Sequence, residues 1–156
     1  MDNSRILVLG LGNVLLSDEG IGVHVIRALE KKNLPGNVTL MDGGTTGFEL
    51  IRLFEGMSKV IIIDAMKADL EVGSVVRLSP ADIESYQDLP FSVHQTGIST
   101  IIKQGKINYP FTELVILGVA VNSYDTFATE LSIAIQQKLP TILRAVLEEI
   151  KLNEKN

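Results

Sequence analysis

Cysteine is missing from this sequence of 156 residues. The chain therefore cannot form disulfide bonds, and it has no thiolate to serve as a nucleophile or as a ligand for zinc or an iron–sulfur cluster. A long hydrophobic run is missing as well, because the longest strongly apolar run, Val60–Ile63, is far too short to span a bilayer. Only a short apolar run follows Arg5 before the glycines begin, which is too little for a secretory signal peptide. We expect a soluble, cytoplasmic protein with no membrane partner.

Basic residues are also scarce. The sequence has 14 Lys and Arg against 19 Asp and Glu, which gives a net charge of −5. A nucleic-acid-binding protein normally carries a basic face or stripe, whereas this chain offers only the neighbours Lys31 and Lys32, so we expect no nucleic-acid partner. With 46% apolar and 21% charged residues, the composition is typical of a globular protein. The length suits one domain, and we predict a single domain over residues 1–156.

Short apolar runs alternate with segments of helical periodicity along the chain. The runs predict strands over residues 6–9, 38–41, 59–63, 74–78 and 114–119. The periodic segments predict helices over 21–29, 48–54, 95–104 and 128–152, with Gly105 ending the third and Pro140 splitting or kinking the last. Another helix should begin at Ser79–Asp82, which supplies a cap, a proline at the first helical position and an early acid. Such alternation is typical of βαβ units and a mainly parallel sheet.

One connection is too short for a parallel βαβ unit. Only about nine residues separate the third and fourth predicted strands, whereas a parallel crossover needs about a dozen or more. We therefore predict that these two strands form an antiparallel hairpin. The resulting fold class is α/β: a three-layer α/β/α sandwich around a roughly five-stranded, mostly parallel sheet with one antiparallel strand.

Ligands of open parallel sheets bind at the carboxyl ends of the strands, and three ionisable residues are predicted to meet there. Glu19 lies in the glycine-rich loop after the first strand, and Asp64 directly follows the third strand. The helix over 95–104 leads into the last parallel strand and so must begin at the same edge, which places His94 there. Two carboxylates and one imidazole are a plausible divalent metal site with open positions. Without sulfur, this set suits nickel, zinc or a similar ion.

Each of these residues also has an ordinary structural explanation when taken alone. Asp64 could cap a loop, Glu19 could complement a helix dipole, and His94 could be a half-exposed residue before a helix. His24, inside the first predicted helix, is better explained by packing, because the sequence contains no HExxH pattern. A non-enzymatic metal-binding module also remains open.

Two other enzyme classes are disfavoured. Gly10-x-Gly12 resembles the start of a dinucleotide-binding fingerprint, but Leu15 occupies the position of its third glycine. A serine hydrolase is not supported, since the chain has no GxSxG elbow.

Four sequence blocks, in order and over essentially the whole chain, resemble the nickel–iron hydrogenase maturation endopeptidases. The blocks are Gly10-Leu11-Gly12-Asn13 with Asp18-Glu19-Gly20-Ile21-Gly22, then Asp42-Gly43-Gly44-Thr45-Thr46-Gly47, then Ile63-Asp64-Ala65, and finally Ser92-Val93-His94-Gln95-Thr96-Gly97. The resemblance implies an α/β/α hydrolase that removes a C-terminal peptide from the precursor of a hydrogenase large subunit. It also implies that Glu19, Asp64 and His94 are the nickel ligands and the catalytic set.

In that family, cleavage depends on nickel already inserted into the precursor, so the resemblance implies that the substrate supplies the Ni²⁺, although other divalent ions can occupy the site. The partner would be the precursor of a large subunit, and we expect the endopeptidase itself to be a monomer. Asn13, Asp18 and Asp42 are candidates for hydrogen bonds that hold the ligands, with a surface position for Asp18 and a turn at Asp42 as the alternatives. A non-catalytic nickel-binding accessory protein of hydrogenase assembly is the alternative function.

Overall fold

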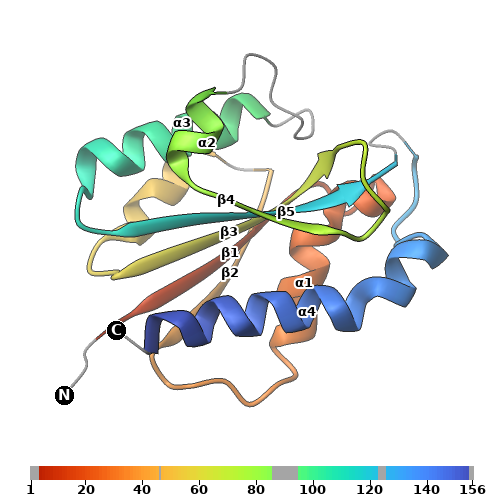
Figure 1. The fold of residues 1–156 in the computed structure, drawn as a ribbon, viewed down its shortest axis with the longest axis horizontal. Helices are drawn as coiled ribbons and strands as arrows, with labels where there is room; N and C mark the ends of the chain where they lie inside the picture. Colours follow the sequence, from red (N-terminus) through yellow and green to blue (C-terminus); the bar gives the residue numbers. More distant parts are fainter. Residues whose placement is uncertain (1–3, 46, 86–94, 123–125, 155–156) are drawn as a thin grey trace.

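A computed structural model describes residues 4–45, 47–85, 95–122 and 126–154. Five strands form one sheet in the order β2-β1-β3-β5-β4 (Figure 1). The strands are β1 (Ile6–Leu11), β2 (Val38–Gly44), β3 (Lys59–Lys67), β4 (Val75–Leu78) and β5 (Glu113–Val121). The pairs β1–β2, β1–β3 and β3–β5 are parallel, while β4 runs antiparallel to β5. This sheet confirms the predicted fold class.

Helices cover both faces of the sheet and complete three layers (Figure 1). One face carries α1 (Ile21–Leu29) and α4 (Ile133–Glu154), and the other carries the 3₁₀ helix η2 (Phe48–Phe54), α2 (Pro80–Ser85) and α3 (Gln95–Asn108). A short 3₁₀ helix, η1 (Ser17–Gly20), precedes α1. Successive side chains of a strand point to opposite faces, so Ile61 and Ile63 pack in the core under α1 and α4, while Val60 and Ile62 pack under η2 and α3.

The hairpin prediction named the wrong partner for the fourth strand. β4 does run opposite to the parallel strands, but it pairs with β5 and not with β3. Both edges of β3 are already occupied by parallel partners, β1 and β5. The free edge of β5 is therefore the place where β4 can add its hydrogen bonds.

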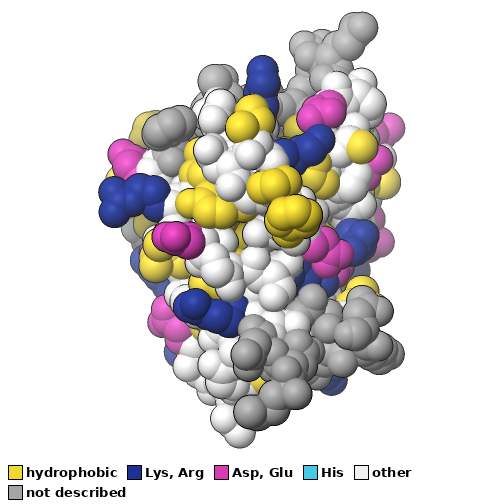
Figure 2. Space-filling view, turned by 90° about the vertical axis from the view of Figure 1, so that its left-hand side faces the viewer, with side chains coloured by type: hydrophobic (Ala, Val, Ile, Leu, Met, Phe, Trp, Pro, Cys, Tyr) yellow, Lys and Arg dark blue, Asp and Glu magenta, His cyan; other side chains and the backbone are white. Residues whose placement is uncertain are grey.

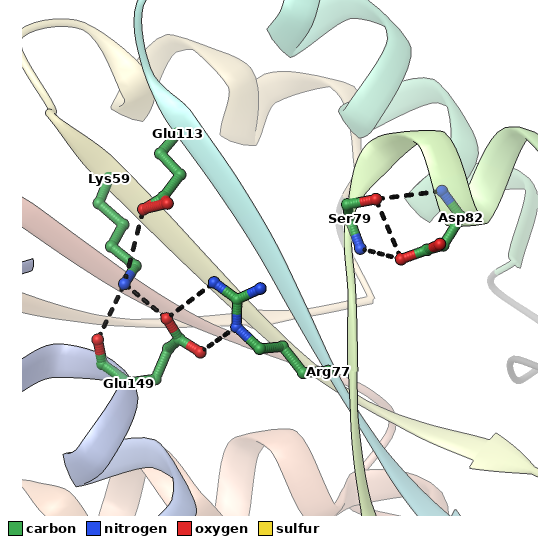
Figure 3. Close-up of polar contacts among 6 residues, drawn as sticks. All are labelled: Lys59, Arg77, Ser79, Asp82, Glu113 and Glu149. Carbon is green, nitrogen blue, oxygen red and sulfur yellow. Dashed lines mark hydrogen bonds and ion pairs between the residues drawn. The ribbon is translucent and has the colours of Figure 1, made fainter. Parts of the chain in front are cut away.

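Two helix boundaries also differ from the prediction. Gly105 lies inside α3, where a Cβ atom would sit 2.7 Å from the Phe54 ring, so this glycine allows close packing and does not end the helix. Pro140 lies inside one continuous α4, which begins at Ile133 and not at residue 128. The buried apolar stripe of α4, including Ile135 and Val146, packs on the sheet and outweighs the cost of the proline. The sequence-predicted start of α2 is confirmed, since Ser79 and Asp82 bond each other reciprocally (Figure 3).

Within the described residues, no helix combines the length and the apolar character that a membrane crossing requires.

Candidate functional site

Asp64 lies where β3 extends beyond its neighbour β1. Pairing of β1 with β3 ends at Gly10 and Ile63, whereas β3 and β5 stay paired as far as Lys67 and Val121. Asp64 is therefore inside the strand, not after it as predicted, because β5 continues to supply hydrogen bonds. Alternation along β3 places Asp64 on the face of Ile62, which packs with α3.

Glu19 reaches the same edge through the tightly folded loop between β1 and α1. Gly12 has a φ of 132°, and a Cβ atom there would lie 2.2 Å from the carbonyl oxygen of Glu19. Only glycine accepts both the backbone conformation and this close approach. The fold of the loop brings the backbone N–H of Asn13 onto the Glu19 carboxylate, to which it donates a hydrogen bond.

The two carboxyl groups are fully buried, and the charge of Glu19 acts on Asp64. Glu19 and Asp64 are both 0% exposed. Burial raises the pKa of Asp64 well above its ordinary value, and the charge of Glu19 raises it further, while a hydrogen bond from the backbone N–H of Ala65 opposes the shift. Oδ2 of Asp64 has no hydrogen-bond partner among the described residues. A buried oxygen of this kind is costly unless a ligand, a proton or a cation completes its contacts.

The third predicted site residue, His94, lies outside the described residues. The residues that are described contain no group of three His, Asp or Glu side chains placed to hold a metal. The structure thus brings two of the three predicted residues together. Carboxylate oxygens at this edge fit a borderline divalent ion that also takes a nitrogen ligand.

The three candidate supporting residues behave differently from one another. Asn13 contacts Glu19 through its backbone, and its side-chain oxygen accepts a hydrogen bond from Leu15. Asp42 is exposed and accepts a hydrogen bond from the backbone N–H of Gly44. This local bond is the one expected if Asp42 stabilises a turn, the alternative to a role in holding the ligands. Asp18 is buried, so the surface alternative is wrong for it, and it bonds Ser132.

Ser132 has no place in the sequence prediction. The available signal was a serine shortly before a helix, which is typical of an N-cap, but nothing in the sequence connects it with residue 18.

His24 lies half-buried on α1, as the packing explanation predicted. Burial lowers its pKa from the ordinary 6.5, the charge of Arg27 lowers it further, and Asp18 acts in the opposite direction.

A shallow groove opens at the other end of the molecule. It consists of two adjoining hollows of about 530 and 660 Å³ between η2 and the end of α3, and Arg52 and Tyr109 line both. Figure 2 faces the side of the molecule where α3 ends, and hydrophobic side chains gather there with charged ones around them. Because η2 and α3 lead into the starts of β3 and β5, this groove belongs to the amino edge of the sheet. It contains neither Glu19 nor Asp64.

Known proteins named for hydrogenase maturation are similar to this chain in sequence and in fold. The family model described as hydrogenase maturation protease matches residues 23–149. The chain is 30% identical over 150 residues to the hydrogenase expression/formation protein HupD of Rhodobacter capsulatus, covering 94% of this chain and 71% of that protein. It is 35% identical over 124 residues to the hydrogenase 2 maturation protease of Escherichia coli, covering 78% of this chain and 76% of that one. The solved structure of the hydrogenase maturating endopeptidase HybD from E. coli is similar, with a TM-score of 0.81 and 31% identity over 96% of this chain and 93% of that one.

Proposed function

The chain belongs to the hydrogenase maturation protease family, and from this premise we propose that it removes a C-terminal peptide from the nickel-loaded precursor of a nickel–iron hydrogenase large subunit. The observation that carries the proposal is the pair of fully buried carboxyl groups of Glu19 and Asp64 at the carboxyl edge of the sheet, where burial and the charge of Glu19 raise the pKa of Asp64. If both groups were ionised, they would destabilise the folded protein unless a positive charge faced them. Their arrangement is accounted for by a positively charged group of the substrate.

The nickel in the precursor is that positively charged group. In this proposal Glu19, Asp64 and His94 bind it and so hold the precursor with its C-terminal segment across the edge of the sheet. Nickel would supply Lewis acidity next to the scissile peptide bond. Dependence on nickel makes metal insertion a condition for processing, because a nickel-free precursor loses this anchor.

The residues of the chain have separate tasks in this scheme. The Asn13 N–H orients the Glu19 carboxylate. The uncommitted Oδ2 of Asp64 can hold a proton when no cation faces it and can release the proton when a cation arrives, since a nearby positive charge lowers a carboxyl pKa. Burial excludes water from both groups and strengthens their interaction with the nickel of the substrate.

The experiment that tests this function is a cleavage assay read by intact-mass spectrometry. Purified protein is incubated with a hydrogenase large-subunit precursor prepared with and without nickel, next to the variants Glu19→Ala and Asp64→Asn. Glu148→Gln is the matched control, because Glu148 is an exposed carboxylate of α4.

We expect loss of a short C-terminal peptide only from the nickel-loaded precursor. The wild type and Glu148→Gln should cleave, and the two site variants should not. Binding of the nickel-loaded precursor without cleavage would overturn the endopeptidase and favour the accessory protein. Equal cleavage of the nickel-free precursor would overturn the nickel anchor and leave the endopeptidase standing.

A further inference from the structure

The short helix η1, which carries Glu19, is fastened to a segment more than a hundred residues away in the sequence. The backbone N–H of Ser17 donates to the carbonyl oxygen of Ala128 at 2.7 Å, and Ser17 Oγ donates to the carbonyl oxygen of Glu130 at 2.7 Å. The Asp18 carboxylate accepts hydrogen bonds from the backbone N–H of Ser132 at 2.8 Å and from Ser132 Oγ at 2.7 Å. We call Ser17, Asp18 and Ser132 the clasp.

The backbone of η1 requires such support. Ser17 has a φ of 51°, and among the described residues it is the single non-glycine residue with a positive φ. Side chains other than glycine resist this region, and residues held there persist only where their surroundings determine the conformation. The two hydrogen bonds of Ser17 to Ala128 and Glu130 supply that constraint. The strained position lies two residues before Glu19.

The other half of the clasp ends on a rigid element. Ser132 Oγ also accepts a hydrogen bond from the backbone N–H of Ile135 at 3.3 Å, so Ser132 caps α4 while it bonds Asp18. α4 is held by its buried stripe, including the fully buried Ile135 and Ile142. A movement of η1 relative to the sheet would therefore have to break the contacts of Asp18 with an anchored helix.

We infer that Asp18 and Ser132 are positioning residues that hold the Glu19 carboxylate against Asp64 through the clasp, an inference that rests on the proposed function for its catalytic consequence. Neither residue touches Glu19 through a hydrogen bond that the structure defines. They fix the turn from which the Glu19 side chain projects, as the supporting partners of functional ligands commonly do.

The simpler explanation is that Ser132 only caps α4. The chain offers a matched control for that explanation in Ser79 and Asp82, at the start of α2 (Figure 3). Ser79 donates to the Asp82 carboxylate from its backbone N–H at 2.8 Å and from Oγ at 3.0 Å, and Asp82 N–H donates to Ser79 Oγ at 3.2 Å. This pair has the same chemistry as the Asp18–Ser132 pair and carries no site residue.

The test compares Ser132→Ala, Ser132→Thr and Ser79→Ala with the wild type by amide hydrogen exchange, by thermal melting and by cleavage kinetics. Exchange at the backbone N–H of Asn13 reports on Glu19 directly, because Glu19 accepts that hydrogen bond. Ser132→Ala should speed exchange at Asn13, whereas Ser79→Ala should leave it unchanged. The kinetics are measured far below the melting points of the wild type and of Ser132→Ala. There, Ser132→Ala should lower kcat/KM by roughly 10- to 100-fold. Ser132→Thr, which keeps the hydroxyl, should restore kcat/KM.

The inference is overturned if Ser132→Ala speeds exchange only in the first turn of α4 and leaves Asn13 protected. It is also overturned if kcat/KM of Ser132→Ala matches that of Ser79→Ala. If Ser132→Ala does not fold, Asp18→Asn, which keeps the shape of the side chain, takes its place in the same exchange measurement. A wild type that cleaves no precursor would refute the proposed function, and the exchange at Asn13 would still decide the role of the clasp.

Discussion

Replacing Glu149 by glutamine should cost this protein a large part of its stability, because Glu149 neutralises a buried lysine. Lys59 is 1% exposed, and its Nζ lies 2.6 Å from Glu149 Oε2 and 2.9 Å from the Glu149 carbonyl oxygen. Arg77 Nε donates to Glu149 Oε1 at 2.6 Å (Figure 3). In Glu149→Gln, the remaining carboxylate paired with Lys59 among the described residues is that of Glu113, 3.6 Å away and 51% exposed.

Breaking one side of a buried ion pair costs about 3–5 kcal/mol. A protein of this size loses about 2–4 °C of melting temperature per kcal/mol, so the midpoint of Glu149→Gln should fall by about 6–20 °C. Arg77→Gln is the control, because the Arg77 side chain is 52% exposed and its contribution to the ion pair is screened to about 0–1 kcal/mol.

Urea unfolding at several pH values is the assay. Burial alone would raise the pKa of Glu149, but the hydrogen bonds and charges of Arg77 and Lys59 hold it below its ordinary 4.5. The stabilisation that ionised Glu149 contributes is therefore complete above pH 4.5 and is lost as the pH falls through its lower pKa in the folded protein. The difference in the free energy of unfolding between the wild type and Glu149→Gln should accordingly narrow in acid. A loss within about 1 kcal/mol at pH 7, or an equal loss in Arg77→Gln, would refute the reasoning.

Three further predictions concern the site and its surroundings. Because burial and Glu19 raise the pKa of Asp64 above 3.8, the wild type should lose stability as the pH rises from that value through the raised pKa. Asp64→Asn should flatten this dependence in urea unfolding between pH 5 and 8, and an unchanged slope would speak against the raised pKa. Gly22→Ala would place a Cβ atom 2.4 Å from the carbonyl oxygens of Ile63 and Leu11 and should cost more than about 3 kcal/mol in thermal melting, whereas Gly36→Ala, with open space around it, should melt like the wild type. His94→Ala should remove most Ni²⁺ binding in calorimetry, and the wild type should bind less Ni²⁺ below about pH 6, where histidine is protonated; a flat pH response would indicate ligation by carboxylates alone.

The layers of the fold and the edge that holds the site follow from local features of the sequence. Apolar runs such as 59–63 and the helical spacing over 21–29 reflect contacts between near neighbours in the chain, so they can be recognised before the tertiary structure exists. The rule that parallel strands end at one edge places Glu19 and Asp64 at the same edge of the sheet, and in the structure both are buried there, with the charge of Glu19 acting on Asp64. The placement of His94 stays a prediction.

Contacts between distant residues were decided only by the tertiary structure. The Asp18–Ser132 bond joins residues 114 apart, and the Lys59–Glu149 pair joins residues 90 apart. The choice of β5 as the partner of β4, and the close packing of Gly105 on Phe54, likewise depend on which edges and faces meet after the chain folds. Local patterns record how a segment prefers to fold and which of its sides is apolar. They do not indicate which strand or helix the apolar side of a segment will contact, because that contact is selected by the packing of all layers together.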